Sequence, residues 1–186
     1  MTDMSPHYQL ARATPDNKLF EQLRKAWLED VRAFDEVEDY ANPYIEHAER
    51  IISDRFSNYG IYILHNNQGK YVGLLHANTA RLPKTTGVTL RVNWILLGPR
   101  YDFEEVTGEE FAQVSASILF GAVRLAQGQS SEMKADHIKI HLINLGDKQF
   151  ARGVAYTLLE HGSASQVAVR GNWLHLDHIR PQGGGR

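Results

Sequence analysis

The chain has 186 residues, of which 42% are hydrophobic and 23% charged, and its formal net charge is −2. These values are typical of one soluble globular domain, and they lack the strong positive charge of most nucleic-acid-binding proteins. The absence of cysteine excludes disulfides, thiolate nucleophiles and cysteine-ligated zinc. No apolar run approaches the roughly 18 residues of a membrane span, and the first residues lack the apolar core of a secretory signal. We therefore expect a cytoplasmic protein with no nucleic-acid or membrane partner.

The first part of the chain predicts a strand followed by two helices. Residues 8–13 are a short strand candidate. Thr14-Pro15-Asp16 predicts a helix start, with Thr14 as the cap and Pro15 at the first helical position. Apolar residues then recur at helical spacing over 16–34 and again over 43–56.

Three strands follow, over residues 61–65, 71–77 and 89–97. They are rich in β-branched and aromatic residues, which favour pleated structure. Asn66-Asn67-Gln68-Gly69 joins the first two as a hairpin turn, and Gly98-Pro99 ends the third.

The remaining elements complete a mixed arrangement of strands and helices. They are an apolar helix at 109–127, a strand at 137–142, a helix at 148–161 and strands at 166–170 and 172–176. The order β-α-α-β-β-β-α-β-α-β-β predicts an α+β fold with a mixed sheet, in one domain over residues 1–180. The Gly-rich residues 181–186 are expected to be a disordered tail.

The connection between strand 89–97 and helix 109–127 is the most informative part of the sequence. Free backbone N–H groups and the helix dipole favour anions at a helix N-terminus. Five carboxylates nevertheless crowd this connection: Asp102, Glu104, Glu105, Glu109 and Glu110. They would repel an anionic ligand, or Glu109 and Glu110 simply stabilise the start of the helix.

The element order and four short segments resemble the GCN5-related N-acetyltransferase (GNAT) superfamily. The segments are Leu10–Asp16, Tyr71–Leu75, Leu97–Arg100 and Tyr156–Gly162. The resemblance implies a GNAT-like sheet that splays near its fourth and fifth strands. It also implies an N-acyltransferase that moves an acyl group from acetyl-CoA, or another acyl-CoA, to a small-molecule amine, without a metal.

In that family a turn of pattern Q/R-x-x-G-x-G/A binds the acyl-CoA pyrophosphate at the start of the helix after the fourth strand. The matching stretch here is Glu110–Ser115, with an acid at the leading position and Gln113 and Ser115 in place of the glycines. The loop that follows Pro99 is also longer than the pattern allows. The donor contacts that the resemblance implies come from Leu97, Gly98, Gln113, Val114, Ser115 and Ala116.

The catalytic candidates are His76 and Tyr156. Family members often use a tyrosine in the last helix to protonate the departing thiolate; Leu158 holds the matching position here, and Tyr156 lies two residues earlier. His76, at the end of a predicted strand, is the best base near neutral pH, unless it is a structural or surface histidine.

Other chemistry has weaker support. His137 and His141 are expected about 13 Å apart on one strand, which is too far for one metal ion. His175 and His178 lack the further ligands of a metal centre, so we expect no metal site. Two alternatives remain. One is a non-catalytic GNAT-like domain that binds a small molecule or a protein in the same cleft, and the other is a homodimer formed through the C-terminal strands.

Overall fold

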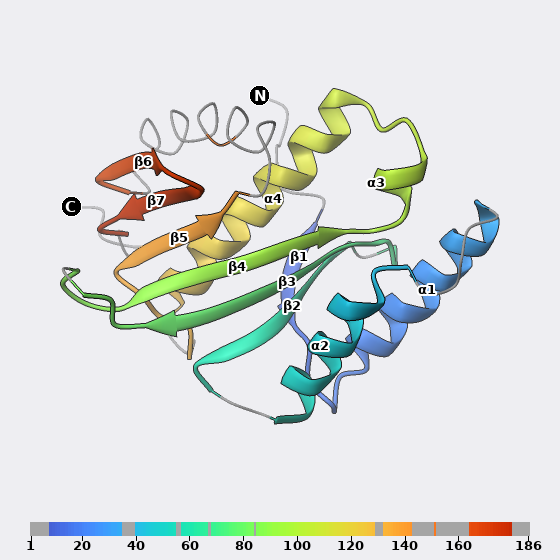
Figure 1. Ribbon diagram of the computed structural model, residues 1–186, viewed down its shortest axis with the longest axis horizontal. Coiled ribbons are helices and arrows are strands. Elements are labelled where there is room, and N and C mark those ends of the chain that lie inside the picture. Colours follow the sequence, from blue (N-terminus) through green and yellow to red (C-terminus); the bar gives the residue numbers. More distant parts are fainter. Residues whose placement is uncertain are drawn as a thin grey trace. The chain divides into compact units, whose positions relative to one another are not determined.

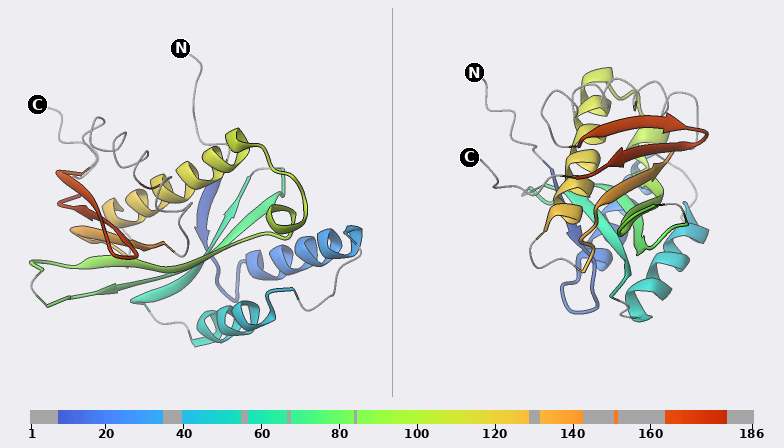
Figure 2. Two further views of the ribbon diagram at one scale, coloured as in Figure 1. Left: turned by 45° about the horizontal axis from the view of Figure 1, so that its top comes forward. Right: turned by 90° about the vertical axis from the view of Figure 1, so that its left-hand side faces the viewer.

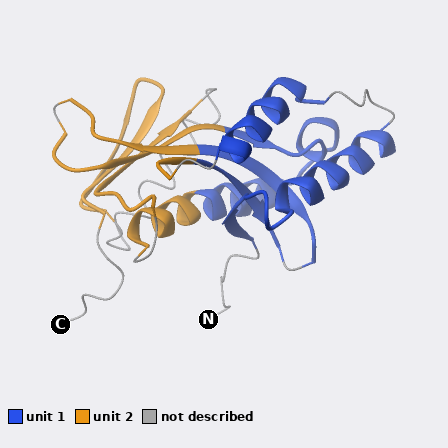
Figure 3. Cartoon of the chain, turned by 90° about the horizontal axis from the view of Figure 1, so that it is seen from below, with its two compact units in different colours: residues 1–56, 60–76, 95–118 blue, residues 57–59, 77–94, 119–186 orange. Residues whose placement is uncertain are grey.

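The computed structural model describes residues 8–34, 40–54, 57–66, 68–83, 85–128, 132–142, 151 and 164–179. The chain divides into two compact units (Figure 3). Unit 1 comprises residues 1–56, 60–76 and 95–118, and unit 2 comprises residues 57–59, 77–94 and 119–186. The third strand, the fourth strand and the longest helix each run from one unit into the other. The expected single domain over residues 1–180 stays a prediction.

The strands of the described residues form one mixed sheet of seven strands in the order β1-β2-β3-β4-β5-β7-β6 (Figure 1). They are β1 (Gln9–Arg12), β2 (Tyr59–His65), β3 (Tyr71–Ala80), β4 (Thr89–Leu97), β5 (His137–His141), β6 (Gln166–Arg170) and β7 (Trp173–Asp177). β4 and β5 are parallel, whereas β1–β2, β5–β7 and β6–β7 are antiparallel. The described helices are α1 (Leu19–Ala33), α2 (Asn42–Asp54), α3 (Arg100–Phe103) and α4 (Gly108–Gln127). The predicted α+β fold with a mixed sheet is confirmed.

In unit 1, α1 and α2 lie along one side of β1, β2 and β3, and the first half of α4 lies on the other side (Figures 1 and 2). The apolar stripe of α1 is buried, with Leu23 fully enclosed and Trp27 3% exposed. The indole Nε1–H of Trp27 donates a hydrogen bond to the Tyr71 carbonyl at 2.9 Å. Amphipathic spacing thus fixes the helix face that meets the sheet.

In unit 2, strands β4, β5 and β7 bury one apolar face. Its side chains are Leu90, Val92, Ile138, Ile140, Leu174 and Leu176. Residues 119–127 of α4 lie along this face, with Ala122 and Ala126 enclosed (Figures 1 and 2). Because strand side chains alternate, the residues between these apolar ones point to the opposite face. Among the described residues, every helix is too short or too polar to cross a bilayer.

The predicted start of α1 is wrong by three residues. The Thr14 hydroxyl accepts the Asn17 N–H at 3.3 Å, and the Asn17 side-chain oxygen accepts the Thr14 N–H at 3.1 Å. These mutual bonds close a turn, because short polar side chains readily satisfy nearby backbone donors. Lys18 then takes a left-handed backbone conformation (φ 55°) before the helix begins at Leu19. Thr14 therefore does not cap the helix.

Other boundaries are close to the predictions. α3 was not expected, and it lies in the connection that the sequence predicts to be a loop. β7 begins one residue later than predicted because Gly171, in a left-handed conformation, and Asn172 form the turn. The predicted helix at 148–161, apart from Ala151, and the predicted tail at 181–186 lie outside the described residues.

Candidate functional site

Within the described residues, β4 extends beyond its pairing with β5. The parallel pairing joins Thr89 to His137 and ends with Val92 and Ile140, whereas β4 continues to Leu97. The Gly98 N–H donates to the Val72 carbonyl of β3 at 3.1 Å. Because adjacent residues of a strand point to opposite sides, the N–H and C=O groups of Leu97 point away from β3.

Gly98 ends this strand against the indole of Trp27. A Cβ atom on Gly98 would lie 2.8 Å from Trp27 Nε1 and 3.1 Å from its Cε2. Real Cβ contacts are not this short, so only glycine lets the chain pass here without displacing the indole. Trp27 is itself held by its hydrogen bond to Tyr71. The contact with Trp27 therefore fixes the position of the backbone at Gly98, at the end of β4.

The connection after Gly98 is anchored by aromatic side chains. The Tyr40 hydroxyl donates to the Leu97 carbonyl at 3.2 Å and also bonds the Asp102 carboxylate. Phe103 packs between Tyr40 and Phe34, with ring centroids 5.6 and 5.9 Å away. Burial raises the pKa of Tyr40, and the adjacent Asp102 carboxylate raises it further. The phenol therefore remains a hydrogen-bond donor.

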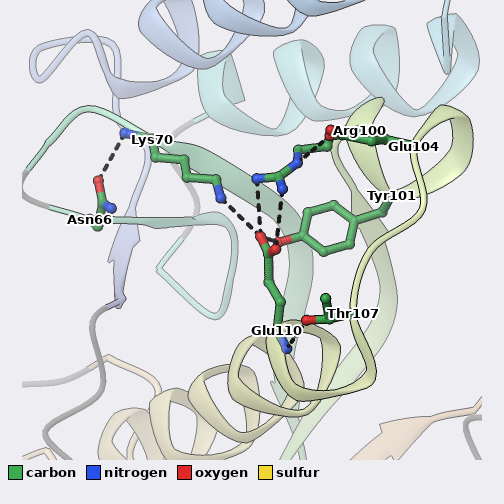
Figure 4. A network of polar contacts seen from close by, with 7 residues as sticks. All are labelled: Asn66, Lys70, Arg100, Tyr101, Glu104, Thr107 and Glu110. Carbon is green, nitrogen blue, oxygen red and sulfur yellow. Dashed lines mark hydrogen bonds and ion pairs between the residues drawn. The ribbon is translucent and has the colours of Figure 1, made fainter.

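The N-terminus of α4 is capped by Thr107. Its hydroxyl accepts the Glu110 N–H at 3.2 Å, and its carbonyl accepts the Phe111 N–H at 3.0 Å. The spacing Thr107-x-x-Glu110 is that of a capping box, in which the glutamate would return to the cap residue. Here the Glu110 carboxylate instead makes the charged contacts drawn in Figure 4.

Glu110 is the centre of a network of two cations and a phenol (Figure 4). Lys70 Nζ donates to Oε1 at 2.9 Å. The two terminal nitrogens of Arg100 donate to Oε1 and Oε2 at 3.2 and 3.3 Å. The Tyr101 hydroxyl lies 3.4 Å from Oε1. The hydrogen bond from Lys70 lowers the pKa of Glu110, and the charge of Arg100 adds to this effect, while burial opposes it.

Each cation of this network is positioned by its own element. The Asn66 side-chain oxygen accepts the Lys70 N–H at 2.9 Å, which holds Lys70 at the start of β3. Arg100 lies in α3, where its Nε donates to Glu104 one turn later. Of the five acids in the connection, Asp102, Glu104 and Glu110 thus have hydrogen-bonded partners. Arg100 within the connection and Lys70 before β3 therefore neutralise part of its negative charge.

The six predicted donor-binding residues fall on two elements of unit 1. Leu97 and Gly98 end β4, and residues 113–116 lie in the early turns of α4. Gln113 is exposed, Ser115 and Ala116 are half-buried, and Val114 is fully buried. A ligand contact from Val114 would therefore have to involve its backbone. Binding by these residues stays a prediction.

His76 lies farther along β3 than the residues that face Gly98. Asn93 Nδ2 donates to Asn78 Oδ1 at 2.8 Å, which shows with the Gly98–Val72 bond that β3 and β4 are antiparallel. Since four residues of strand span about 13 Å, His76 is nearer to Ile95 than to Gly98.

The ring of His76 meets that of His47 from α2 edge to face, with centroids 5.5 Å apart. Both histidines are half-buried. His47, Lys70 and Arg100 were not among the site residues predicted from the sequence. Tyr156, the other catalytic candidate, lies outside the described residues.

The histidines weighed as metal ligands lie on β5 and on or directly after β7 in unit 2, and the expectation of no metal site stays a prediction. Within the described ranges no three histidine, aspartate or glutamate side chains are grouped as metal ligands. His137 is buried, with Nδ1 3.0 Å from an Asp177 carboxylate oxygen and Nε2 2.7 Å from the Thr86 carbonyl. This histidine therefore joins β5 to β7 and to the β3–β4 connection.

Among known proteins, similarity to this chain is found only with solved structures. No family model and no curated protein matches the sequence. The chain is similar to a GNAT-family acetyltransferase from Staphylococcus aureus Mu50 (12% identity, TM-score 0.42), with 93% of this chain and 99% of that chain covered. It is also similar to a mutant spermidine N-acetyltransferase from Vibrio cholerae (13% identity, TM-score 0.49, 93% and 94% covered).

A spermidine/spermine N-acetyltransferase from Vibrio cholerae, solved with manganese ions, gives 13% identity and a TM-score of 0.45, with 95% of this chain and 92% of that chain covered. Of these three structures, the one from Staphylococcus aureus is described as a member of the GNAT family that the sequence motifs resemble. At such identities and TM-scores they carry no argument about activity. The fold therefore rests on the chain's own topology, and the function on its own residues.

Proposed function

We propose that the chain is an acyl-CoA-dependent N-acyltransferase, which transfers an acyl group from a CoA thioester to an amine. The observation that carries this proposal is the course of β4. Within the described residues its pairing with β5 ends at Val92, and its edge at Leu97 then leads to Gly98 and the capped start of α4. An extended donor can add to such an edge through backbone hydrogen bonds, with its phosphates toward a helix N-terminus.

The chemistry requires an oxyanion donor more than a strong base. As the amine attacks the thioester carbon, negative charge develops on the carbonyl oxygen, and in this proposal the backbone N–H of Leu97, which points away from β3, stabilises it. In this proposal His76, at the level of Ile95, accepts the proton of the amine. Tyr156 protonates the departing thiolate.

Lys70 and Arg100 are the cations nearest to the α4 N-terminus in the network of Figure 4. In the proposed function they attract the donor phosphates, and Glu110 occupies them in the free protein. This gives the chain a phosphate-binding arrangement without the glycine-rich turn. Donor binding must then compete with an internal carboxylate.

The alternative is a non-catalytic domain with a GNAT-like fold that binds a small molecule or a protein through the same edge. The observation that favours it is that Lys70 and Arg100 both form ion pairs with Glu110. In this alternative, the ion pairs of Glu110 with Lys70 and Arg100 stabilise the fold, and the two cations do not bind phosphate. Binding of the donor and turnover of the donor therefore have to be measured separately.

Isothermal titration with acetyl-CoA and with longer acyl-CoAs tests the donor. The proposal predicts binding, and no detectable heat at about millimolar donor would contradict it. Glu110→Gln should tighten binding by up to about tenfold because it releases two cations, equivalent to about 1.4 kcal/mol. Glu105→Gln is the matched control, since it removes the same charge from an exposed position in the same connection.

Turnover is followed as release of free CoA thiol in the presence of a panel of amines. His76→Asn should lower kcat and leave the donor Kd unchanged if His76 accepts a proton. If the donor binds but none of the amines in the panel gives thiol release, the result would favour the non-catalytic alternative.

A further inference from the structure

Three permanent cations lie on one face of the unit 2 strands. The strand register pairs Arg91 with Lys139, and Lys139 with His175. It also pairs Arg170 with Trp173. Because side chains alternate, these residues point away from the apolar face that residues 119–127 of α4 cover. We call this set the basic face: Arg91, Lys139, His141, Arg170, Trp173 and His175.

The basic face has little negative charge of its own. Of the side chains that the four described strands β4 to β7 place on it, Asp177 is the only carboxylate. Asp177 is held by His137, whose ring is 4% exposed and whose Nδ1 lies 3.0 Å from the carboxylate. The carboxylate is therefore directed to a buried imidazole at one edge of the face.

Trp173 fixes the position of Arg91. The guanidinium carbon of Arg91 lies 5.5 Å from the centroid of the indole, within the range of a cation–π contact. The His141 ring packs on the same indole, with centroids 4.8 Å apart. The indole is thus already in contact with two side chains, and its main effect is to hold a cation in place.

The charges on this face act on one another. Burial lowers the pKa of His175, and the positive charges of Lys139 and Arg170 lower it further, against the effect of Asp177. A neutral imidazole therefore lies among three cations. An anion bound here would gain attraction from all three, and it would favour the charged form of His175.

We propose that the basic face binds an extended acidic segment of a partner protein, with carboxylates at alternate positions. Strands are about 4.8 Å apart, so the cations are distributed over about 14 Å from β4 to β6, which is about the total span of three alternate carboxylates in an extended segment. The occupied indole disfavours a single-stranded nucleic acid, whose bases stack on open aromatic rings. This inference does not depend on acyl transfer.

The test is a titration of the full chain, at low ionic strength, with a short synthetic peptide of alternating glutamate and serine. Binding is followed through the resonances of His175 and the Trp173 indole. We expect saturable shifts at both, a rise in the pKa of His175, and loss of binding as salt is added. Absence of any shift would overturn the proposal.

Lys139→Glu should weaken peptide binding by about tenfold or more, because it reverses the central charge of the face. Arg124→Glu makes the same charge change at an exposed position on α4, which covers the other side of these strands, and should leave binding nearly unchanged. If both variants weaken peptide binding equally, the effect comes from the net charge of the protein and not from the basic face, and the proposal is overturned. Tighter binding of oligothymidylate than of the peptide would also overturn it, in favour of a nucleic acid.

Discussion

The connection between β4 and α4 and the basic face of unit 2 both gather cations, but only the first neutralises them. Lys70 and Arg100 converge on Glu110, and Arg100 also bonds Glu104. On the basic face, the strands supply one carboxylate, and it is bonded to His137. Acids of the β4–α4 connection are thus paired with nearby cations. The basic face, by contrast, which no motif in the sequence indicates, carries more positive than negative charge.

This difference shows that the number of charges in a segment does not predict its electrostatic role. What matters is whether each charge has a partner close enough to hydrogen bond, because exposed charges farther apart are largely screened by salt. A formal net charge of −2 therefore conceals two different surfaces. The four variants below separate them, from the largest expected effect to the smallest.

His137→Ala should have the largest effect on stability, about 3 kcal/mol, because it removes two hydrogen bonds and leaves Asp177 without its imidazole. Urea unfolding measures the change. His141→Ala, on the same strand but only half-buried, should cost about 1 kcal/mol. Equal losses would mean that the Asp177 carboxylate does not depend on His137, and the description of the basic face would be wrong.

Gly98→Ala should cost about 2 kcal/mol, because its Cβ would lie 2.8 Å from Trp27 Nε1 and force the indole to move. Gly108→Ala is the control, since no atom lies within 4 Å of a Cβ at that position. The indole fluorescence of Trp27 should shift in the first variant alone. An unchanged stability in Gly98→Ala would show that the contact with Trp27 does not fix the backbone at Gly98.

Glu110→Gln should lower stability at neutral pH by about 1 kcal/mol, after allowance for solvent screening. The folded pKa of Glu110 is lowered, so its contribution is present above the unfolded pKa and is lost as the pH falls through the folded pKa. Wild type and Glu110→Gln should therefore converge in stability in acid. A constant difference down to low pH would contradict the ion-pair account, and Glu105→Gln supplies the baseline.

Lys139→Gln should change stability by only about 0.3 kcal/mol, because surface charges contribute little. It should raise the pKa of His175, since the Lys139 charge is one cause of its lowering after burial. An NMR titration of the His175 ring measures this shift. If the pKa of His175 stays the same, the cations of the basic face do not act on one another.

Most of the fold could be predicted because its elements are locally encoded. The β-branched and aromatic residues of β4, ended by Gly98-Pro99, and the apolar stripe of α4 specify both elements nearly to the residue. α3 was missed because four helical residues carry no periodic signal; its local evidence is the spacing of Arg100 and Glu104, one turn apart. The start of α1 was misplaced because Thr14 resembles a cap and instead closes a turn with Asn17.

The site could be predicted only in part, because its contacts join distant parts of the chain. The spacing of Thr107 and Glu110 could have signalled the helix cap. The partner of Glu110 could not be found in this way, since Lys70 lies 40 residues earlier and meets it only in the folded sheet. The same holds for His47 beside His76, and for Arg91 over Trp173.

The most direct test of the contrast is one NMR pH titration of the wild-type chain that follows both the Glu110 carboxyl and the His175 ring. Paired charges at the start of α4 predict a Glu110 pKa below the ordinary glutamate value. Unbalanced cations on the basic face, together with burial, predict a His175 pKa below the ordinary histidine value. An ordinary or raised pKa for Glu110, or a raised pKa for His175, would contradict the account.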